Sequence, residues 1–401
     1  MNPIKASALA DPRFKANPYP FYARMRAESP VFPVSVPFFG RGWLVTRYED
    51  VVTVARDDRF SRDLLPKLRW LPQFVIVPMT RHMLGQDPPN HTRLRKLVSQ
   101  AFTPGRIERL RARIQAVCDE LLEAALRTGS FDLVKGYAHP IPFTVIAELL
   151  GIPQEDRQRF HTLVQGSIPI TAPTGILDVP MSLPYLWLIL RYFRRLFAER
   201  RARPGDDLLS ALVQAEEAGD RLDEDELLGM ASLLLSAGYE TTVHLIGNAS
   251  LALLQHPDER ARFVSEASLM DSAIEELLRY TSTVEMTLPR ILREDVTLSS
   301  VTMPRGDWVS GVIGSANRDE SVFAAPDTLD LGRDPNPHLA LGKGRHFCLG
   351  ASLLRLEAEI ALGTLFRRFP GLRLAQPAES LRWRKLAPLR SLVELPVTGL
   401  D

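Results

Sequence analysis

Cysteine is scarce in this sequence: Cys118 and Cys348 are the only two among 401 residues. Two thiols cannot form the disulfide framework of a small secreted protein, and their scarcity fits a reducing compartment. A structural zinc site is excluded as well, because His346 and Cys348 form one local pair of ligands and no second pair follows. We therefore expect a cytoplasmic protein.

An excess of charge of one sign and long hydrophobic runs are also missing. The net charge is +1, so the total gives no sign of a nucleic-acid partner or of a strongly charged substrate. No stretch of about 18 uncharged apolar residues occurs, and residues 1–10 lack the apolar core of a signal peptide. With 45% hydrophobic and 24% charged residues, the composition is that of an ordinary globular protein without a transmembrane segment.

Periodic hydrophobic patterns predict a mainly helical chain with short strands. The predicted helices are 20–28, 49–56, 106–129, 140–150, 155–164, 185–197, 223–255, 272–280 and 350–369, and the predicted strands are 42–47, 284–288, 295–302 and 392–397. Closely spaced prolines exclude a long helix over 64–84, which favours an irregular apolar segment. Prolines recur over 167–184, and the alternatives for 167–197 are a lid over an apolar cavity, a surface that touches lipid, and a plain packed helix.

The longest predicted helix departs from the usual rules in its middle. Asp223 is the expected N-cap, and Glu226 is its partner in a capping box. The run that follows is apolar almost all round, which is typical of a helix buried in the centre of a domain. Gly238, Glu240 and Thr241 come next, although glycine weakens a helix and buried polar groups need partners. Such departures occur mostly at functional sites; the alternative is a kink with Thr241 bonded to a carbonyl.

Cys348 lies in the most distinctive stretch of the chain. Gly342 and Gly344 precede it, and Gly350 follows it just before an apolar helix pattern. Glycine permits backbone conformations that other residues resist, and it lets a large flat group approach the main chain. Loop amides and the N-terminus of the next helix favour a thiolate, which is a ligand for a soft metal centre such as haem iron. The alternative is that Cys348 is a small buried hydrophobic residue.

Two further pairs of polar side chains are spaced along predicted helices. Asp87 is the expected cap of a helix that carries His91 and Arg95 on one face, where they can bind an anion such as a carboxylate or form a solvated surface. Glu276 and Arg279 are three residues apart, so their charges also share a helix face. Neither pair identifies a function by itself.

Taken in order, these segments resemble the cytochrome P-450 superfamily, the thiolate-haem monooxygenases, in its soluble bacterial form. The cysteine signature of that family is matched over residues 341–350, with Leu341 where the family has phenylalanine. Residues 237–242 resemble the oxygen-binding part of its central helix, and the resemblance covers nearly the whole chain. It implies one domain over 1–401, mainly α with small β-sheets and β-rich over about 30–85 and 284–310. It also implies haem between the central helix and the cysteine loop.

The resemblance assigns roles to residues by position. Cys348 is implied to be the axial ligand of haem b, and Thr241 and Glu240 are the implied catalytic pair. A structural ion-pair triad is implied for Glu276, Arg279 and Arg333. The haem carboxylates are implied to contact His91, Arg95, Arg290 and His346, and the remaining haem contacts are Ala237, Gly238, Leu341, Gly342 and Gly350. The candidate substrate walls are apolar and predict a hydrophobic substrate: Trp70, Phe74, Val75, Ile76, Leu233, Val284, Met286, Leu288 and Leu392.

The implied activity is hydroxylation or epoxidation of a hydrophobic small molecule with O2 and two electrons. A fatty acid, a terpenoid or steroid, and a polyketide all remain open as substrates. The implied electron donors are a ferredoxin and its reductase, which would dock on a basic face made of Lys343, Arg345, Arg93, Lys96 and Arg106. A solvated charge cluster is the alternative for those residues. The protein is expected to be a monomer.

Two other functions are compatible with a haem-thiolate protein: a peroxide-driven peroxygenase and a non-catalytic ligand-binding or sensing protein. The pair Glu240 and Thr241 argues against both. Peroxygenases of the resembled family typically lack this acid and alcohol, and a pure binder has no need of polar groups buried there. A helical protein without haem is a third alternative, which a carbon-monoxide difference spectrum of the reduced protein decides.

Overall fold

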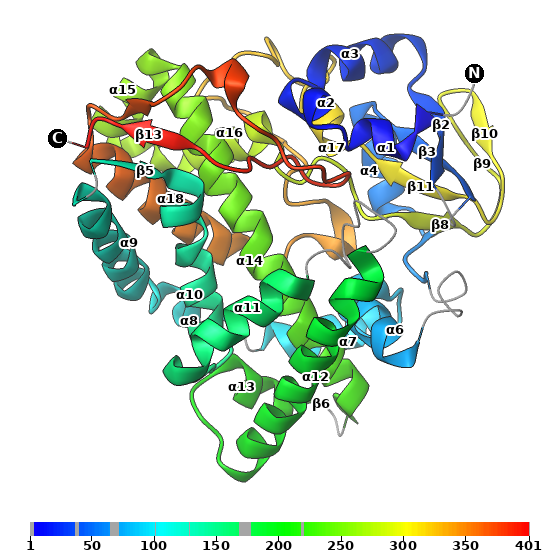
Figure 1. Cartoon of the computed structure of the whole chain (residues 1–401). Helices are drawn as coiled ribbons and strands as arrows, with labels where there is room; N and C mark the ends of the chain where they lie inside the picture. Colours follow the sequence, from blue (N-terminus) through cyan, green and yellow to red (C-terminus); the bar gives the residue numbers. More distant parts are fainter. Residues whose placement is uncertain are drawn as a thin grey trace. The chain divides into compact units, whose positions relative to one another are not determined.

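The computed structural model describes residues 4–36, 40–64, 72–100, 102–127, 129–167, 178–217 and 220–400. These residues belong to two compact units. The first unit is made of 1–60, 110–142 and 241–401, and the second is made of 61–109 and 143–240. Each unit therefore collects segments that are far apart in the sequence, as the colours of Figure 1 show.

A six-stranded sheet in the first unit joins strands from the N-terminal part of the chain with strands from residues 290–311 (Figure 1). Its strand order is β1-β2-β3-β11-β8-β4. The bounds are Ile4–Lys5 for β1, Val31–Val36 for β2, Gly40–Val45 for β3, Phe60–Ser61 for β4, Arg290–Leu292 for β8 and Trp308–Gly311 for β11. The strand predicted at 42–47 is confirmed as β3, which pairs antiparallel with β2 and parallel with β11.

The two faces of this sheet are covered by different helices, because side chains alternate along a strand. Trp43 and Val45 of β3 pack in one hydrophobic cluster with Val51 of α4 (Tyr48–Arg56). Leu44, between them in the sequence, packs in a second cluster with Tyr22 of α3 (Tyr19–Glu28). The helices predicted at 20–28 and 49–56 are thus confirmed as α3 and α4, and each covers one face of the sheet.

The remaining elements of the first unit are helical, apart from two small sheets. Helices α9 and α18 pack along each other, as Figure 1 shows. Strand β13 lies between β12 and β5, and β9 pairs with β10. The helices are α1 Ala6–Leu9, α2 Pro12–Ala16, α9 Arg111–Leu126, α15 Pro257–Ser265, α16 Met270–Thr281, α17 Ile313–Ala316 and α18 Ala351–Arg368. The strands are β5 Ser130–Asp132, β9 Val296–Leu298, β10 Val301–Met303, β12 Arg373–Leu374 and β13 Pro396–Thr398, and one π-helical turn spans Val134–Ala138.

The second unit is almost entirely helical. Helix α12 packs against α11 and α13, and Pro184 lies inside α12. The helices are α6 Gln73–Thr80, α7 Asn90–Ser99, α8 Pro104–Glu108, α10 Pro140–Leu149, α11 Arg157–Ser167, α12 Asp178–Ala202 and α13 Leu208–Gln214. The same unit contains an antiparallel pair of two-residue strands, β6 at Glu216–Glu217 and β7 at Asp220–Arg221.

Helix α14 (Glu224–Gln255) contributes to both units and is unbroken over 32 residues. Its predicted capping box is confirmed. The Glu226 amide donates to the Asp223 side chain at 2.8 Å, and the Asp223 amide donates to the Glu226 side chain at 3.0 Å. The box fixes the start of the helix by satisfying amides that have no partner within it.

Some local predictions were wrong. Residues 284–288 do not form a strand; their one β-like feature is the bridge between Val284 and Leu389. The closing strand is β13 at Pro396–Thr398 and not 392–397. Asp87 does not cap α7, because its side chain instead accepts from the Arg62 amide and the Ser61 hydroxyl. In these segments the local conformation depends on contacts that the local sequence pattern does not reveal.

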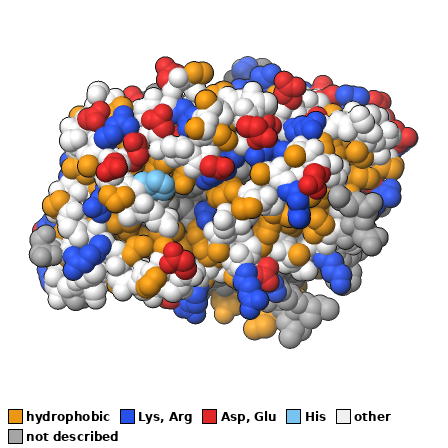
Figure 2. Space-filling model, turned by 90° about the horizontal axis from the view of Figure 1, so that it is seen from above, with side chains coloured by type: hydrophobic (Ala, Val, Ile, Leu, Met, Phe, Trp, Pro, Cys, Tyr) orange, Lys and Arg blue, Asp and Glu red, His pale blue; other side chains and the backbone are white. Residues whose placement is uncertain are grey.

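The surface mixes charges of both signs. On the face shown in Figure 2, acidic and basic side chains are interspersed with hydrophobic ones, as a net charge of +1 leads one to expect. Among the described residues, no helix combines the length and the hydropathy that a membrane span requires.

Candidate active site

Cys348 lies in a loop whose shape depends on glycine and on backbone hydrogen bonds. Gly342 and Gly344 have φ angles of 76° and 73°, in the region that favours glycine. The Cys348 amide donates to the Leu341 carbonyl at 2.9 Å. The Cys348 side chain is half-buried, and α18 begins three residues later. A thiol on a defined turn is thus left accessible in the first unit.

The first unit exposes apolar side chains, one of them in this loop. Phe347, next to Cys348, is 40% exposed, and Leu288 in the same unit is 45% exposed. At Gly350 a side-chain Cβ would meet no atom within 4 Å. Exposed apolar side chains of this size offer contact area to a flat apolar group.

Positive charge approaches Cys348 from α18. Arg355 is paired with Glu275, with 2.6 Å between Nε and Oε1, and this hydrogen bond raises the pKa of Arg355. Cys348 acts in the same direction on the pKa of Arg355 through its charge. Burial opposes ionisation of Glu275, but hydrogen bonds from Arg355 and His338 outweigh it and lower the pKa of Glu275 to about 2. The carboxylate therefore holds the guanidinium near the cysteine loop.

The predicted triad residues meet in a buried network. Arg279 binds Glu276 through two hydrogen bonds of 2.7 and 2.8 Å, and Arg333 Nε lies 3.1 Å from both Glu276 oxygens. The side chains of Glu276 and Arg279 are fully buried. Phe323 stacks on Arg279 at 5.4 Å from the ring centroid, a contact that sequence reasoning missed because nothing local connects the two residues. This network fixes α16 to the segment that precedes the cysteine loop.

Arg290 and His346 are two of the predicted haem-carboxylate contacts, and both belong to the first unit. Arg290 of β8 is 7% exposed and donates to the Phe60 carbonyl at 3.0 Å and to the Ala55 carbonyl at 3.1 Å. His346 ends a 3-10 turn in the cysteine loop and is half-buried. The loop thus carries both a thiol and an imidazole.

The other two predicted carboxylate contacts lie in the second unit. His91 and Arg95 are on α7, one turn apart on the same face. His91 is 3% exposed and Arg95 is half-buried. A cationic pair that is largely withdrawn from solvent is more consistent with anion binding than with a solvated surface.

Helix α14 is accessible over one short stretch. Between Glu226 and Leu253 the residues that are not buried are Ser232, Ser236, Ala237, Gly238, Glu240 and Thr241. Ala237, Glu240 and Thr241 follow the spacing i, i+3, i+4, so they share one face of the helix. Gly238 packs against Ile146, whose Cδ1 would lie 3.1 Å from an added Cβ. The predicted functional stretch is thus an opening in an otherwise buried helix.

The predicted substrate-wall residues have different environments. In the second unit Ile76 and Leu233 are buried and Phe74 is half-buried. In the first unit Leu392 is buried, Val284 is half-buried and Leu288 is exposed. Met286 packs in the hydrophobic cluster of Tyr22 and Phe32, so it serves the core of the sheet. Trp70 and the side chain of Val75 lie outside the described residues.

Three of the predicted docking cations already belong to ion pairs. Arg345 pairs with Asp58 in the first unit. In the second unit Arg93 pairs with Glu226, and Arg106 lies 3.1 Å from Asp206. The charges of these three arginines are therefore partly neutralised.

A buried acid beside the functional stretch was missed by sequence reasoning. Glu357 of α18 is 1% exposed and shares a hydrogen bond with Thr242, the residue after Thr241. Burial raises the pKa of Glu357 to about 8, and the bond with Thr242 opposes this rise. The sequence did contain one signal. Glu357 stands between the apolar residues Leu356 and Ala358, at a position of α18 that the apolar pattern places inside the protein.

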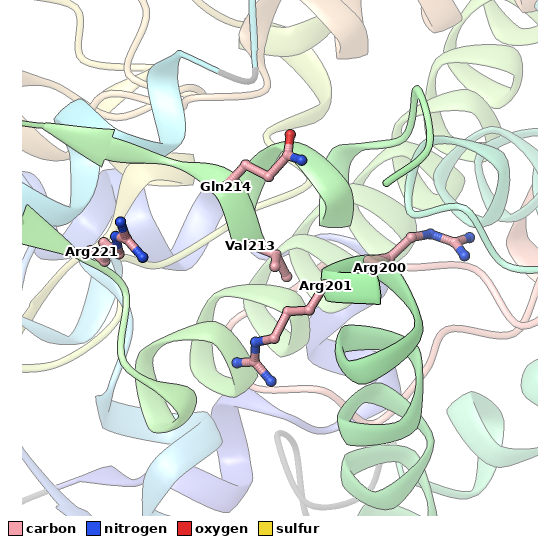
Figure 3. Close-up of a pocket in the computed structure, with 5 residues that line it drawn as sticks. All are labelled: Arg200, Arg201, Val213, Gln214 and Arg221. Atoms are coloured by element: carbon pink, nitrogen blue, oxygen red, sulfur yellow. The ribbon is translucent and has the colours of Figure 1, made fainter. Parts of the chain in front are cut away.

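A hollow of about 290 Å³ in the second unit contains none of these residues (Figure 3). Arg200 and Arg201 of α12, Val213 and Gln214 of α13, and Arg221 of β7 line it. The side chains of Arg200 and Arg201 extend in different directions, so they do not converge on one ligand. This hollow is distinct from the predicted site residues.

Comparison with known proteins gives the family. A family description named Cytochrome P450 matches residues 41–379. The chain belongs to the cytochrome P450 family. It is 41% identical over 395 residues, 96% of both chains, to the "Polyketide biosynthesis cytochrome P450 PksS" of Bacillus subtilis. The solved structure of PksS aligns with a TM-score of 0.92 and 40% identity, covering 98% of this chain and 99% of the other.

Other relatives of this P450 act in different settings. The "Vitamin D(3) 25-hydroxylase" of Pseudonocardia autotrophica is 43% identical over 391 residues, 96% of this chain and 94% of the relative. The structure of P450BioI in complex with an acyl carrier protein that carries hexadec-9Z-enoic acid has a TM-score of 0.89 and 36% identity, covering 96% and 99% of the two chains. The P450 fold, predicted as mainly α with small β-sheets, is confirmed by these alignments.

Family membership makes this P450 a monooxygenase, an oxidoreductase that incorporates an atom of O2, with haem b as its cofactor. The residues of the first unit fit that group. Cys348 offers an accessible thiol, Phe347 and Leu288 offer apolar contact area, and Gly350 leaves room beside the backbone. A thiolate, apolar walls and cationic side chains are the donor set that an iron porphyrin with two carboxylates requires.

Proposed function

We propose that this P450 hydroxylates or epoxidises a hydrophobic small molecule, with O2 and two electrons from a ferredoxin and its reductase. The accessible stretch of α14 is the observation that carries the proposal, because it presents the acid Glu240 and the alcohol Thr241 in a helix that is otherwise buried. Activation of O2 consumes protons as well as electrons, so an acid and a hydroxyl at that point have a chemical purpose.

Cys348 Sγ is the proposed protein ligand of the haem iron and would bind it as a thiolate. Bound haem supplies the redox chemistry that activates oxygen. His91, Arg95, Arg290 and His346 are the proposed donors to its two carboxylates, since charge-assisted hydrogen bonds to carboxylates are strong. Ala237, Gly238, Leu341, Gly342 and Gly350 are the proposed contacts of the ring.

Proton delivery is assigned to the two polar side chains of α14. The Thr241 Oγ1 hydroxyl would hold a proton and donate it where oxygen is reduced. The Glu240 carboxyl would supply protons from solvent, because it is accessible and adjacent in the helix.

The substrate is proposed to be hydrophobic, and a fatty acid, a terpenoid or steroid and a polyketide are the open classes. The proposed walls remain the apolar residues Trp70, Phe74, Val75, Ile76, Leu233, Val284, Met286, Leu288 and Leu392. Their apolar character favours burial of apolar ligand surface. The names of PksS and the vitamin D(3) 25-hydroxylase, which refer to a polyketide pathway and a steroid-like molecule, are in keeping with this class.

The remaining assignments concern setting and partners. We place the protein in the cytoplasm, because neither of its two cysteines belongs to a disulfide and a reducing compartment preserves a free thiolate ligand. It is proposed to act as a monomer of one P450 domain. The basic residues Lys343, Arg345, Arg93, Lys96 and Arg106 remain the proposed docking cations for an acidic ferredoxin.

The deciding experiment is a reconstituted assay with NADH, a generic ferredoxin and its reductase. Thr241→Ala is expected to lower product per NADH by about 100-fold, at the lower end of the range of general acid catalysis. Hydrogen peroxide should rise in proportion, while the carbon-monoxide difference spectrum keeps its red-shifted Soret band. Ser236→Ala removes another accessible hydroxyl of α14 and is the matched control, with unchanged coupling.

Three outcomes would contradict the proposal. Equal product per NADH in Thr241→Ala would remove the role of that hydroxyl. Faster turnover with hydrogen peroxide alone than with the NADH system would instead make the protein a peroxygenase. A wild-type protein that binds haem but forms no product under either condition would be a ligand-binding protein.

A further inference from the structure

A buried ion pair lies far from the cysteine loop in the sequence but within the same unit. Lys15 of α2 and Glu285, in the connection between α16 and β8, have side chains that are 0% and 1% exposed. Lys15 Nζ donates to Glu285 and also to the Ala387 carbonyl, at 2.8 Å. Burial lowers the pKa of Lys15, and the charge of Glu285 opposes that effect. Removing two charges from water is costly, and apolar residues of similar volume often stabilise a fold equally well.

Other groups close this cluster on all sides. Tyr22 of α3 is fully buried, and burial followed by the negative charge of Glu285 raises its pKa well above the usual value. Arg390 donates to the Lys15 carbonyl at 2.8 Å and to the Ala16 carbonyl at 3.0 Å. The guanidinium of Arg390 also lies 3.9 Å from the ring centroid of Trp383. The N-terminal helix α2 is thus attached to residues 383–390 by both side chain and backbone.

The ion pair sits behind two segments that carry proposed substrate walls. Glu285 lies between Val284 and Leu288, and Ala387 and Pro388 precede Leu392 by a few residues. The two segments are also joined directly. The Glu285 amide donates to the Pro388 carbonyl at 2.9 Å, and the Arg390 amide donates to the Thr283 carbonyl at 2.9 Å.

Helix α14 holds the same two segments from another side. Asn248 donates from Nδ2 to the Arg390 carbonyl at 2.7 Å. His244 Nδ1 lies 2.9 Å from the Ser391 hydroxyl, and both side chains are buried. His244 follows Thr241 by one turn of the helix. The segments 283–288 and 387–392 are therefore fixed between α2 and the helix that carries the proposed proton relay.

We propose that Lys15 and Glu285 are positioning residues that set the spacing of the two wall segments and so determine which ligand shapes this P450 accepts. The inference rests on the proposed function, because that function assigns Val284, Leu288 and Leu392 to the substrate wall. The physical reason is geometric. A buried ion pair tolerates little displacement, since moving either segment outward would leave a charge without its partner in a medium of low dielectric.

The test is a double variant, Lys15→Met with Glu285→Gln, in the haem-loaded full-length protein. Both changes conserve side-chain volume and leave no unpaired buried charge, so the fold is expected to persist. Backbone amide exchange over 283–288 and 387–392 should accelerate about tenfold, while exchange in α9 stays the same. Leu122→Ala in α9 is the control, because it destabilises the same unit through a fully buried core residue.

Ligand shape is read with three azoles of increasing size that share one iron-binding nitrogen: imidazole, 4-phenylimidazole and clotrimazole. In the double variant the affinity for imidazole should remain within about twofold of wild type, since the iron–nitrogen bond is common to all three. For each of the two larger azoles, the ratio of its affinity to the affinity of imidazole should change by about fivefold or more. That change corresponds to roughly 1 kcal/mol of binding free energy. Leu122→Ala should leave this ratio unchanged.

The outcomes separate this inference from the proposed function. Wild-type protein without a red-shifted Soret band under carbon monoxide would overturn the proposed function. With that band present, unchanged exchange and an unchanged azole ratio in the double variant would overturn the positioning role. Exchange that accelerates equally in every helix would also overturn it, since it would reduce Lys15 and Glu285 to contributors to global stability.

Discussion

The two cysteines of this P450 lie in contrasting surroundings within a single unit. Cys118 is completely buried in α9, whereas Cys348 is half-buried in a loop. Burial raises the pKa of Cys118 to about 12, Tyr137 opposes the rise through a hydrogen bond, and the acidic groups Asp119 and Glu357 add to it. Cys348 instead interacts electrostatically with the guanidinium of Arg355.

This difference teaches that a free cysteine is identified by its surroundings and not by its number. The surroundings of Cys118 keep the thiol neutral and unreactive, so it behaves as a small hydrophobic residue. A glycine-shaped turn, an accessible side chain and a nearby cation favour the thiolate that a metal requires. The comparison can be broken or sharpened by four measurements.

The largest expected effect is the loss of the haem-thiolate signature. Cys348→Ala should abolish the red-shifted Soret band of the reduced carbon-monoxide complex and reduce product to background, because the proposed iron–sulfur bond is gone. Cys118→Ala should leave both intact. Difference spectra of the two purified variants check this, and a red-shifted band in Cys348→Ala would remove the proposed ligand.

The next effect concerns the network that supports the cysteine loop. Glu276→Gln leaves the guanidiniums of Arg279 and Arg333 without their carboxylate in a buried site, and we expect a loss of about 3–5 kcal/mol in the free energy of unfolding. Glu120→Gln weakens the exposed pair with Arg113 and should cost less than about 1 kcal/mol. Urea unfolding of both variants measures the contrast, and equal losses would contradict it.

A smaller effect is expected from a polar group beside Tyr137. Cys118→Ser places a hydroxyl in the apolar interior of α9, which should lower the free energy of unfolding by about 1–3 kcal/mol. Since Cys118 has no role in the haem site, the Soret band and the coupling of product to NADH should stay the same. Any shift of the band in Cys118→Ser would mean that the two cysteines are not independent.

The smallest effect is a pH dependence near the cysteine loop. Glu275 is ionised in the folded protein down to its pKa of about 2, below the 4.5 of an unperturbed glutamate. Its stabilisation is therefore fully present above about pH 4.5 and disappears as the pH falls towards 2. The partial exposure of this carboxylate reduces the expected contribution to about 1–2 kcal/mol. Urea unfolding between pH 3 and 7 should show the advantage of wild type over Glu275→Gln shrinking towards acid pH.

Much of the helical structure could be predicted because its signals are local. The capping box of Asp223 and Glu226 marked the start of α14, and the break in its apolar run marked the stretch around Thr241. The glycines around Cys348 indicated a loop before α18, and Gly342 does adopt the conformation that requires glycine. In each case the residues that decide the structure are within a few positions of one another.

The remaining structure depends on partners that are distant in the sequence. Nothing near Lys15 indicates that it will be fully buried against Glu285, and nothing near Phe323 indicates that it will cover Arg279. The expected strand at 284–288 failed for the same reason. Its amides pair with Pro388 and Gly311, one from each of two separate segments, and so do not extend a single ladder.

The pairing of β3 with β11 has a consequence for biosynthesis. Gly42 is opposite Trp308 in that parallel ladder, so the first part of the sheet is synthesised long before its neighbour exists. At a translation rate of about 5–20 residues per second, roughly 13 to 50 s pass between the synthesis of Gly42 and that of Trp308. During this time β2 and β3 expose an unpaired edge, the kind of surface that invites aggregation. Abundant chaperone should therefore raise the yield of folded protein.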